Sequence, residues 1–335
     1  MIAIDLPMIW AGIIAFGVFM YVFMDGFDLG IGILFRLAED DEARDTMMNT
    51  VAPVWDGNET WLVLGGAGLL AAFPLAYSAI LPALYVPIVV MLLALIFRGV
   101  AFEFRFKAEA SRRFWGGAFH YGSLVATFAQ GVVLGSFVQG IEVQGRDYAG
   151  GTFDWLSPFS VMTGVGLVGG YALLGSTWLI MKTAGNLQAW ARRMAWWSLV
   201  AVLVFIAVVS LWTPLLNGAI ADRWFAWPNI AFLSPIPLAT AGLAYVIWRT
   251  LRTERETVPF FAALGLFGLS YAGLGVSLWP YVIPPSVSIW DAASAPESQR
   301  FLLYGVAVMI PLILVYTAYS YYVFRGKTDP GAGYH

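Results

Sequence analysis

Residues 51–61 read VAPVWDGNETW, and they place two carboxylates and an amide where a long apolar segment begins. The acids are Asp56 and Glu59, and the amide is Asn58. A second acidic pair, Asp25 and Asp28, lies inside the apolar segment that precedes this stretch. Ionisable side chains at such depth are costly in lipid, so both pairs are candidates for function.

The composition identifies a membrane protein. Of the 335 residues, 60% are hydrophobic and 12% are charged, whereas a soluble domain carries about 25% charged residues. Cys is absent, and His occurs only as His120 and His335. These counts exclude disulfides, thiolate metal sites and Cys-ligated haem, and they leave few ligands for any cofactor. We therefore expect no catalytic centre, metal site or cofactor site in this chain.

Apolar runs of about 20 residues, the length of a membrane-spanning helix, recur along the whole chain. They predict an all-α polytopic protein with one integral-membrane domain, residues 1–335, and nine transmembrane helices. The predicted helices comprise residues 9–34, 57–77, 79–102, 117–140, 158–181, 194–216, 229–248, 259–281 and 301–324.

The basic residues predict the orientation of these helices. All but Arg146, Arg223 and Arg300 fall in the connections after the first, third, fifth and seventh segments, at the ends of those segments, or in the C-terminal tail. Lys and Arg are enriched in cytoplasmic loops. We therefore expect the N-terminus in the periplasm, the C-terminus in the cytoplasm, and function within the membrane or at a surface shared with a partner.

Asp25 and Asp28 are three residues apart, so they share one face of a helix. The predicted orientation places them in the cytoplasmic half of the first segment. Such side chains should face a bundle interior, a water-filled cavity or a partner subunit. The alternative is a structural role, with an Asp bonded to a neighbouring helix or paired with Arg36.

Asp56 and Glu59 repeat this spacing at the cytoplasmic start of the second segment. An Asp at the N-cap with a Glu three residues later is typical of a capping box. Capping is compatible with proton handling, because a carboxylate at a helix N-terminus stays ionised and can collect protons from the cytoplasm. Joined by water, the two pairs predict a proton path, although transporters use similar pairs.

Three neighbouring side chains are candidates for support of this path: Trp55, Asn58 and Arg98. Arg98 ends the third segment close to Glu103 and Arg105, and pairing among these residues is the structural interpretation. In the fourth segment, Gln130 is predicted to form hydrogen bonds across helices.

At these residues the sequence resembles subunit II of the cytochrome bd-type quinol oxidases. The resemblance rests on DGFDLG at residues 25–30 and on APVWDGNETW at residues 52–61. It continues through FR at 97–98, Arg105, PYVIP at 280–284, WDA at 290–292 and YTAY at 316–319. It covers nearly the whole chain, and the chain length is closer to that of the cyanide-insensitive branch.

The resemblance implies a haem-free subunit II that pairs with a haem-bearing subunit I in the bacterial cytoplasmic (inner) membrane. Subunit I of the family carries haems b558, b595 and d, or b in place of d. The family's complex oxidises quinol near the outer face and reduces dioxygen to water with protons taken from the cytoplasm. Small accessory subunits occur in the family, as does a structural quinone in subunit II, and the fold is two four-helix bundles plus one peripheral helix.

The resemblance also implies a proton channel at the subunit interface, lined by acids of subunit II. Its residues correspond to Asp25 and Asp56, with Asp28, Trp55 and Glu59 as nearby supports. Glu59 stands where some members have Gln, so it is not expected to be indispensable.

Two other functions fit the residues taken alone. A proton-coupled secondary transporter also uses paired intramembrane carboxylates, often with inverted repeats and broken helices. No repeat is evident here, and the acids lie toward one side of the membrane. The other function is a structural or assembly subunit that has no role in proton transfer.

Overall fold

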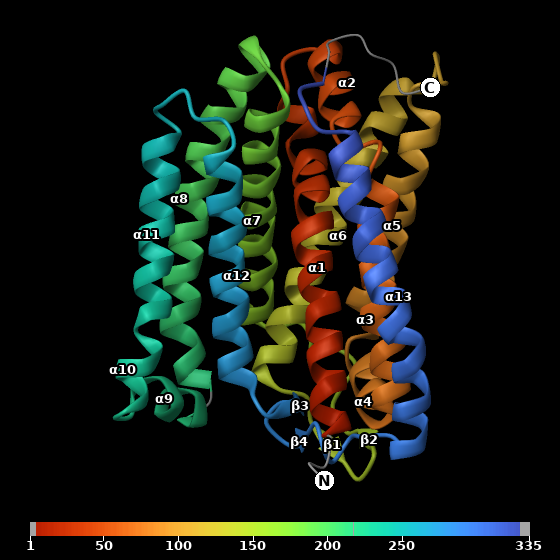
Figure 1. Cartoon of the computed structure of the whole chain (residues 1–335), viewed down its shortest axis with the longest axis vertical. Coiled ribbons are helices and arrows are strands. Elements are labelled where there is room, and N and C mark those ends of the chain that lie inside the picture. Colours follow the sequence, from red (N-terminus) through yellow and green to blue (C-terminus); the bar gives the residue numbers. More distant parts are fainter. Residues whose placement is uncertain (1–4, 217, 329–335) are drawn as a thin grey trace.

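The fold is described from a computed structural model, which covers residues 5–216 and 218–328. Long helices run roughly parallel to the long axis of the molecule (Figure 1). The start of α1 and the end of α13 lie at opposite ends. We call the end that carries α2 the α2 end, and the end that carries the short strands the hairpin end. Eight helical stretches of the described chain are long and apolar enough to cross a membrane.

The elements follow one another in this order: α1 (Leu6–Leu34), the 3-10 turn η1 (Phe35–Leu37), α2 (Asp41–Asn49), α3 (Trp55–Ala72), α4 (Pro74–Ala83), α5 (Tyr85–Phe104), α6 (Arg112–Gln139), β1 (Val143–Gln144), β2 (Asp147–Tyr148), α7 (Pro158–Lys182), α8 (Gly185–Leu216), α9 (Gly218–Phe225), α10 (Asn229–Leu233), α11 (Pro235–Thr250), α12 (Val258–Leu278), β3 (Tyr281–Ile283), β4 (Val287–Ser288) and α13 (Pro296–Val323).

The all-α polytopic fold is confirmed, but the second predicted segment differs from the helix observed. It corresponds to α3, which ends at Ala72 and is not among the eight spanning stretches. The predicted boundary near residue 78 lies inside α4, and the next long helix begins at Tyr85. The physical reason is Pro74, because a proline disfavours helical geometry at the residue before it and offers no N–H.

The break between α3 and α4 leaves a backbone carbonyl without a partner in its own helix. Residues far away in the sequence donate hydrogen bonds to it. The Ala72 carbonyl accepts from the Ser294 N–H at 2.8 Å and from the Gln299 side-chain amide at 3.2 Å. The Trp10 indole donates to the Gln299 carbonyl at 3.1 Å. The start of α13 is thereby fixed to the hairpin end of α1 and α3.

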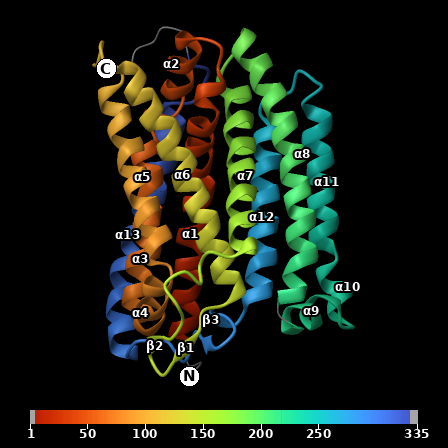
Figure 2. The same cartoon turned by 180° about the vertical axis from the view of Figure 1, so that it is seen from behind.

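Helix α7 lies between α6 and α8 and also packs on α1 and α12 (Figure 2). Its approach to α1 is very close, because a Cβ on Gly30 would lie 1.8 Å from the Tyr171 carbonyl oxygen. A Cβ on Gly175 would lie 2.4 Å from the backbone of Gly30. Small residues permit such backbone contact between membrane helices.

Two short hairpins lie at the hairpin end of the molecule. Strand β1 pairs with β2, and β3 pairs with β4, both antiparallel. The Ile141 N–H donates to the Pro284 carbonyl at 3.2 Å and connects the two loops. The proline-rich stretch after α12 is thus a hairpin that closes this end.

The last described residues are bound to the α2 end by charged contacts. The Lys182 ammonium donates to the carbonyls of Phe324 at 2.6 Å and Gly326 at 3.0 Å. Lys327 lies 2.7 Å from Glu256, which also accepts from Gln188 at 2.9 Å. These two hydrogen bonds lower the pKa of Glu256 from its ordinary value of 4.5.

We expect the attachment of this segment to weaken when Glu256 is protonated. The depressed pKa means that Glu256 stabilises the folded state above its ordinary pKa and loses this effect as pH falls through the lowered value. The chain has no Cys, so Thr328→Cys gives one site for a spin label. The label should become more mobile as pH falls through this lowered pKa and, in Glu256→Gln, already at neutral pH. The neighbouring exposed residue Glu254 provides the control, Glu254→Gln; equal mobility in both variants contradicts the prediction.

Candidate functional site

A group of polar side chains is buried where α1, α3 and α5 meet, toward the α2 end. Its centre is the ion pair of Asp25 on α1 and Arg98 on α5, whose Oδ1 and Nη1 atoms are 2.6 Å apart. Both residues have 0% of their surface exposed. A buried ion pair is costly to desolvate, and removing either partner leaves an uncompensated charge. This pair therefore connects the two helices and requires both residues.

Pairing of Arg98 with Glu103 or Arg105 and pairing of an Asp with Arg36 are wrong, whereas a bond from an Asp to a neighbouring helix is confirmed for Asp28. Glu103 binds Lys107 at 3.3 Å on the surface rather than Arg98. Arg36 donates to the Tyr121 hydroxyl at 3.1 Å, so it is not the partner of an Asp. The reason is that α6 packs on both α1 and α5, so the long Arg98 side chain reaches an acid 73 positions away in the sequence.

Arg105 also pairs with a residue other than Arg98. Its guanidinium and that of Arg112 both bind the carboxylate of Asp45 on α2. Asp45 thus connects α2 to the turn between α5 and α6. This contact closes the α2 end next to the buried site.

Asp28 lies one turn after Asp25 and has different partners. Its Oδ2 accepts from the Asn58 side-chain amide at 2.7 Å, and the same amide nitrogen lies 3.3 Å from the Met24 carbonyl. The Tyr321 hydroxyl of α13 donates to Asn58 Oδ1 at 2.9 Å. Asp28 is fully buried and, among the described residues, forms no ion pair within 4.0 Å.

A second polar branch extends from Asp25 toward α6 and α7. Tyr21 lies one turn before Asp25, and its hydroxyl is within electrostatic range of that carboxylate. Gln130 of α6 donates to the Tyr21 hydroxyl at 2.6 Å and accepts from the Tyr171 hydroxyl at 3.0 Å. The prediction that Gln130 bonds across helices is confirmed.

Asp56 and Glu59 do not form a capping box. The N-cap of α3 is Val54, no side chain caps this helix end, and Asp56 lies inside the first turn. Asp56 is exposed, whereas Glu59 is partly buried and lies within electrostatic range of Arg98 and Asp25. The difference arises because the backbone of residues 51–54 already turns, so α3 begins at Trp55.

Trp55 supports the site by packing. Its ring stacks parallel to Phe102 with centroids 4.7 Å apart, and the Arg98 guanidinium carbon lies 5.9 Å from the ring. Gly99 leaves room for this ring, because a Cβ there would lie 3.3 Å from Trp55. Trp55 therefore covers the ion pair on the side facing α3.

The structure brings all the predicted residues to one region, and it adds three tyrosines that the sequence analysis missed. Tyr21 could have been identified from the sequence, since it lies four positions before Asp25 on the same helix face. Tyr171 and Tyr321 could not have been identified in this way, because they belong to helices far away in the sequence. Their hydroxyls lie at the ends of the two branches.

The described residues contain no group of three or more His, Cys, Asp or Glu that could hold a metal ion. His120 is engaged locally, with Nδ1 2.9 Å from the Gly32 carbonyl. Among the described residues, haem binding is therefore not shown.

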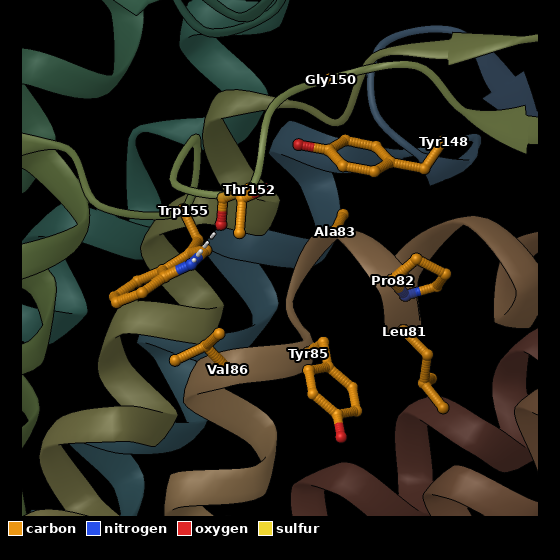
Figure 3. A pocket seen from close by; sticks show the side chains of 9 residues that line it. All are labelled: Leu81, Pro82, Ala83, Tyr85, Val86, Tyr148, Gly150, Thr152 and Trp155. Atoms are coloured by element: carbon orange, nitrogen blue, oxygen red, sulfur yellow. Dashed lines mark hydrogen bonds between the residues drawn. The ribbon is translucent and has the colours of Figure 1, made fainter.

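A cavity of about 520 Å³ lies at the hairpin end, between the start of α5 and the loop after β2 (Figure 3). Its walls are mostly apolar. The Tyr148 hydroxyl bonds the Gly151 carbonyl at 2.7 Å, and the Trp155 indole bonds the Thr152 carbonyl at 3.0 Å. Both donors are thus engaged within the loop, and burial raises the pKa of Tyr148 to about 12. The structural quinone stays a prediction.

Comparisons with known proteins assign the chain to a family. The family model for cytochrome bd terminal oxidase subunit II matches residues 6–324. The chain belongs to the cytochrome bd terminal oxidase subunit II family. It is therefore a multi-pass membrane subunit of a bacterial respiratory oxidase, and membership implies a subunit I partner. This membership decides against the proton-coupled transporter.

Relatives of this bd oxidase subunit match over nearly their whole length. Cytochrome bd-I ubiquinol oxidase subunit 2 of Escherichia coli K12 is 30% identical, with 96% of this chain and 95% of the relative covered. Cytochrome bd ubiquinol oxidase subunit 2 of Bacillus subtilis is 27% identical, with 92% and 93% covered. The solved bd oxidase of Geobacillus thermodenitrificans has the same fold, with a TM-score of 0.76, 17% identity and coverage of 96% and 97%. The cyanide-insensitive branch stays a prediction.

Proposed function

We propose that this chain is the haem-free subunit of a ubiquinol:dioxygen oxidoreductase and that it carries protons from the cytoplasm toward the oxygen-reducing site of its partner. The E. coli and B. subtilis relatives are named as ubiquinol oxidase subunits, which supports ubiquinol as the electron donor. Haems b558, b595 and d, or b in place of d, belong in this proposal to subunit I. They would supply electron transfer and oxygen reduction.

The observation that carries the proposal is the buried polar network around Asp25 and Asp28. Polar groups inside a membrane bundle are costly and mark ion or proton pathways. Exposed Asp56 and partly buried Glu59 lie at the α2 end, and Glu59 is within electrostatic range of the fully buried Asp25. Proton movement through this network needs groups that can release and accept protons, and carboxylates do both.

The four acids have different roles in this proposal. Asp56 and Glu59 collect protons at the α2 end, where water has access. Asp28 relays them, because no cation in the described part of the chain lies within ion-pair distance to fix its charge. Asp25 holds Arg98 as its counter-ion, and the arginine is always charged. Asp25 therefore sets the electrostatic field of the path and keeps the network in place.

The same proposal includes the orientation of the chain. The α2 end faces the cytoplasm, since the connections with most basic residues lie there, and the hairpin end faces the periplasm. Counting α3 with α4 as one passage gives nine passages with the N-terminus outside. The arrangement would be two four-helix bundles, with α13 as the peripheral helix.

Substitution of the acids in the assembled complex tests the proton path. Asp28→Asn should lower ubiquinol-driven oxygen uptake by roughly tenfold or more, since a proton-transfer group contributes at least that much. Asp56→Asn should lower it less, since Glu59 and water can take its place. Oxygen uptake and proton uptake are measured together with haem content.

The control is Glu103→Gln, which removes an exposed acid at the same end of the molecule. If Asp28→Asn and Asp56→Asn both keep full haem content and the turnover of this control, no proton passes through these acids. Loss of haem without a specific loss of turnover per haem favours a purely structural subunit instead.

A further inference from the structure

We infer that Tyr321 is a positioning residue for this proton transfer, acting through Asn58 to fix the orientation of Asp28. The inference rests on the proposed function, because it concerns the same buried acid. It assigns to the last helix a part in the geometry of an acid on the first helix, 293 positions away in the sequence.

The hydrogen bonds have one consistent direction. A tyrosine hydroxyl donates to Asn58 Oδ1 at 2.9 Å, and the amide nitrogen of Asn58 then faces Asp28 Oδ2 at 2.7 Å and Met24 O at 3.3 Å. An Asn side chain has an acceptor on one side and two donors on the other. Tyr321 therefore selects the orientation in which Asn58 presents donors to the acid.

Asp28 depends on this single contact more than its neighbour does. Among the described residues, Asp28 Oδ1 has no hydrogen-bond partner. The charged and titratable groups that face Asp28 are Asp25, Arg98 and Glu59, together with the Tyr321 hydroxyl. Rotation of the Asn58 amide would place its oxygen against the carboxylate, and two acceptors repel each other. Asp28 would then lose the geometry in which it passes a proton.

Helix α13 is otherwise peripheral, which makes its inward tyrosine notable. The most apolar part of α13 has no buried residue. Tyr321, by contrast, lies in an aromatic group on the inner side, with ring centroids 6.5 Å from Phe27 and 6.2 Å from Trp178. Lys182 then binds the carbonyl of Phe324, three residues later. These contacts fix the register of α13 at the level of Asn58.

Tyr321→Phe in the assembled oxidase tests this role. The ring and its packing stay, and only the hydroxyl is lost. We expect kcat for oxygen uptake to fall roughly three- to tenfold, the effect of one neutral hydrogen bond. KM for ubiquinol and haem content should not change, since the substitution removes only the hydroxyl that bonds Asn58. The matched control is Tyr322→Phe, because Tyr322 is exposed and packs on Arg325.

Action through Asn58 predicts non-additivity. Asn58→Ala should lower kcat, and the double variant with Tyr321→Phe should be no slower than Asn58→Ala alone. Additive losses, or a Tyr321→Phe variant as fast as Tyr322→Phe, overturn the inference. If Asn58→Ala does not assemble, the comparison of the two tyrosine variants still decides whether the Tyr321 hydroxyl affects kcat.

The test of the positioning role can fail while the test of the proposed proton path succeeds. When Asp28→Asn is slow and Tyr321→Phe is normal, the proton path stands and only the positioning role fails. When Asp28→Asn is itself normal, both fail. A change in the infrared band of a buried carboxyl group in Tyr321→Phe, at unchanged haem content, would support the role directly.

Discussion

Arg98→Met should prevent stable assembly of the oxidase or strongly lower its thermal stability. The substitution leaves the Asp25 carboxylate with no cation at 2.6 Å in a position with no exposed surface. Breaking a buried ion pair by removing one partner costs about 3–5 kcal/mol. We expect lower yield, lower haem content and a lower unfolding temperature of the purified complex.

Removing both charges should restore stability. In Asp25→Leu with Arg98→Met, no uncompensated charge remains, and replacing a buried ion pair by apolar side chains is often neutral or stabilising. The control is Lys107→Met, which breaks an exposed pair with Glu103 and should cost about 0–1 kcal/mol. A single Arg98→Met variant as stable as Lys107→Met contradicts the prediction. An assembled double variant would also reveal how far turnover depends on this charge pair.

Gly30→Ala should be the most damaging single-methyl substitution in α1. Its Cβ would lie 1.8 Å from the Tyr171 carbonyl and 2.8 Å from the Gly175 backbone nitrogen. Because both contacts are backbone atoms, α1 and α7 must separate. Overpacking of this kind costs about 1–3 kcal/mol, occasionally more. The shift would also displace Asp28, two residues earlier, so turnover should fall with stability.

Gly12→Ala on the same helix is the matched control. A Cβ at Gly12 has no neighbour within 4 Å, and alanine favours helix by up to about 1 kcal/mol relative to glycine. Gly12→Ala should therefore be neutral or slightly stabilising. Unfolding temperature, haem retention and oxygen uptake of both variants are compared side by side. Equal behaviour of the two would mean that the close contact of α1 and α7 does not limit stability.

Most helices could be predicted because a membrane helix needs a continuous apolar stretch of known length. Helix α7, expected at 158–181, comprises Pro158–Lys182, and α13 contains its whole predicted range apart from residue 324. The exception is the stretch around Pro74. There the apolar run continues through a helix break, so hydropathy alone cannot locate the end of α3.

The prediction that Asp56 and Glu59 form a capping box was wrong because it, too, relied on local sequence alone. A capping box is defined by four neighbouring residues, but the start of α3 depends on turns formed by residues 51–54. The spacing of the two acids was compatible with a cap, and the backbone placed it elsewhere. Both acids nonetheless lie at the α2 end, toward which Asp25 and Asp28 also lie.

By itself, the sequence determined that the chain is an all-α membrane protein, that its intramembrane acids are concentrated near one end, and which family it resembles. These properties depend on composition, length and local spacing, which the linear chain contains. Only the tertiary structure decided the partners of those acids: Arg98 for Asp25, and Asn58 with Tyr321 for Asp28. The physical reason is that a buried polar group is stabilised by whichever helix packs against it. That choice depends on contacts such as Gly30 with Tyr171, between residues far apart in the chain.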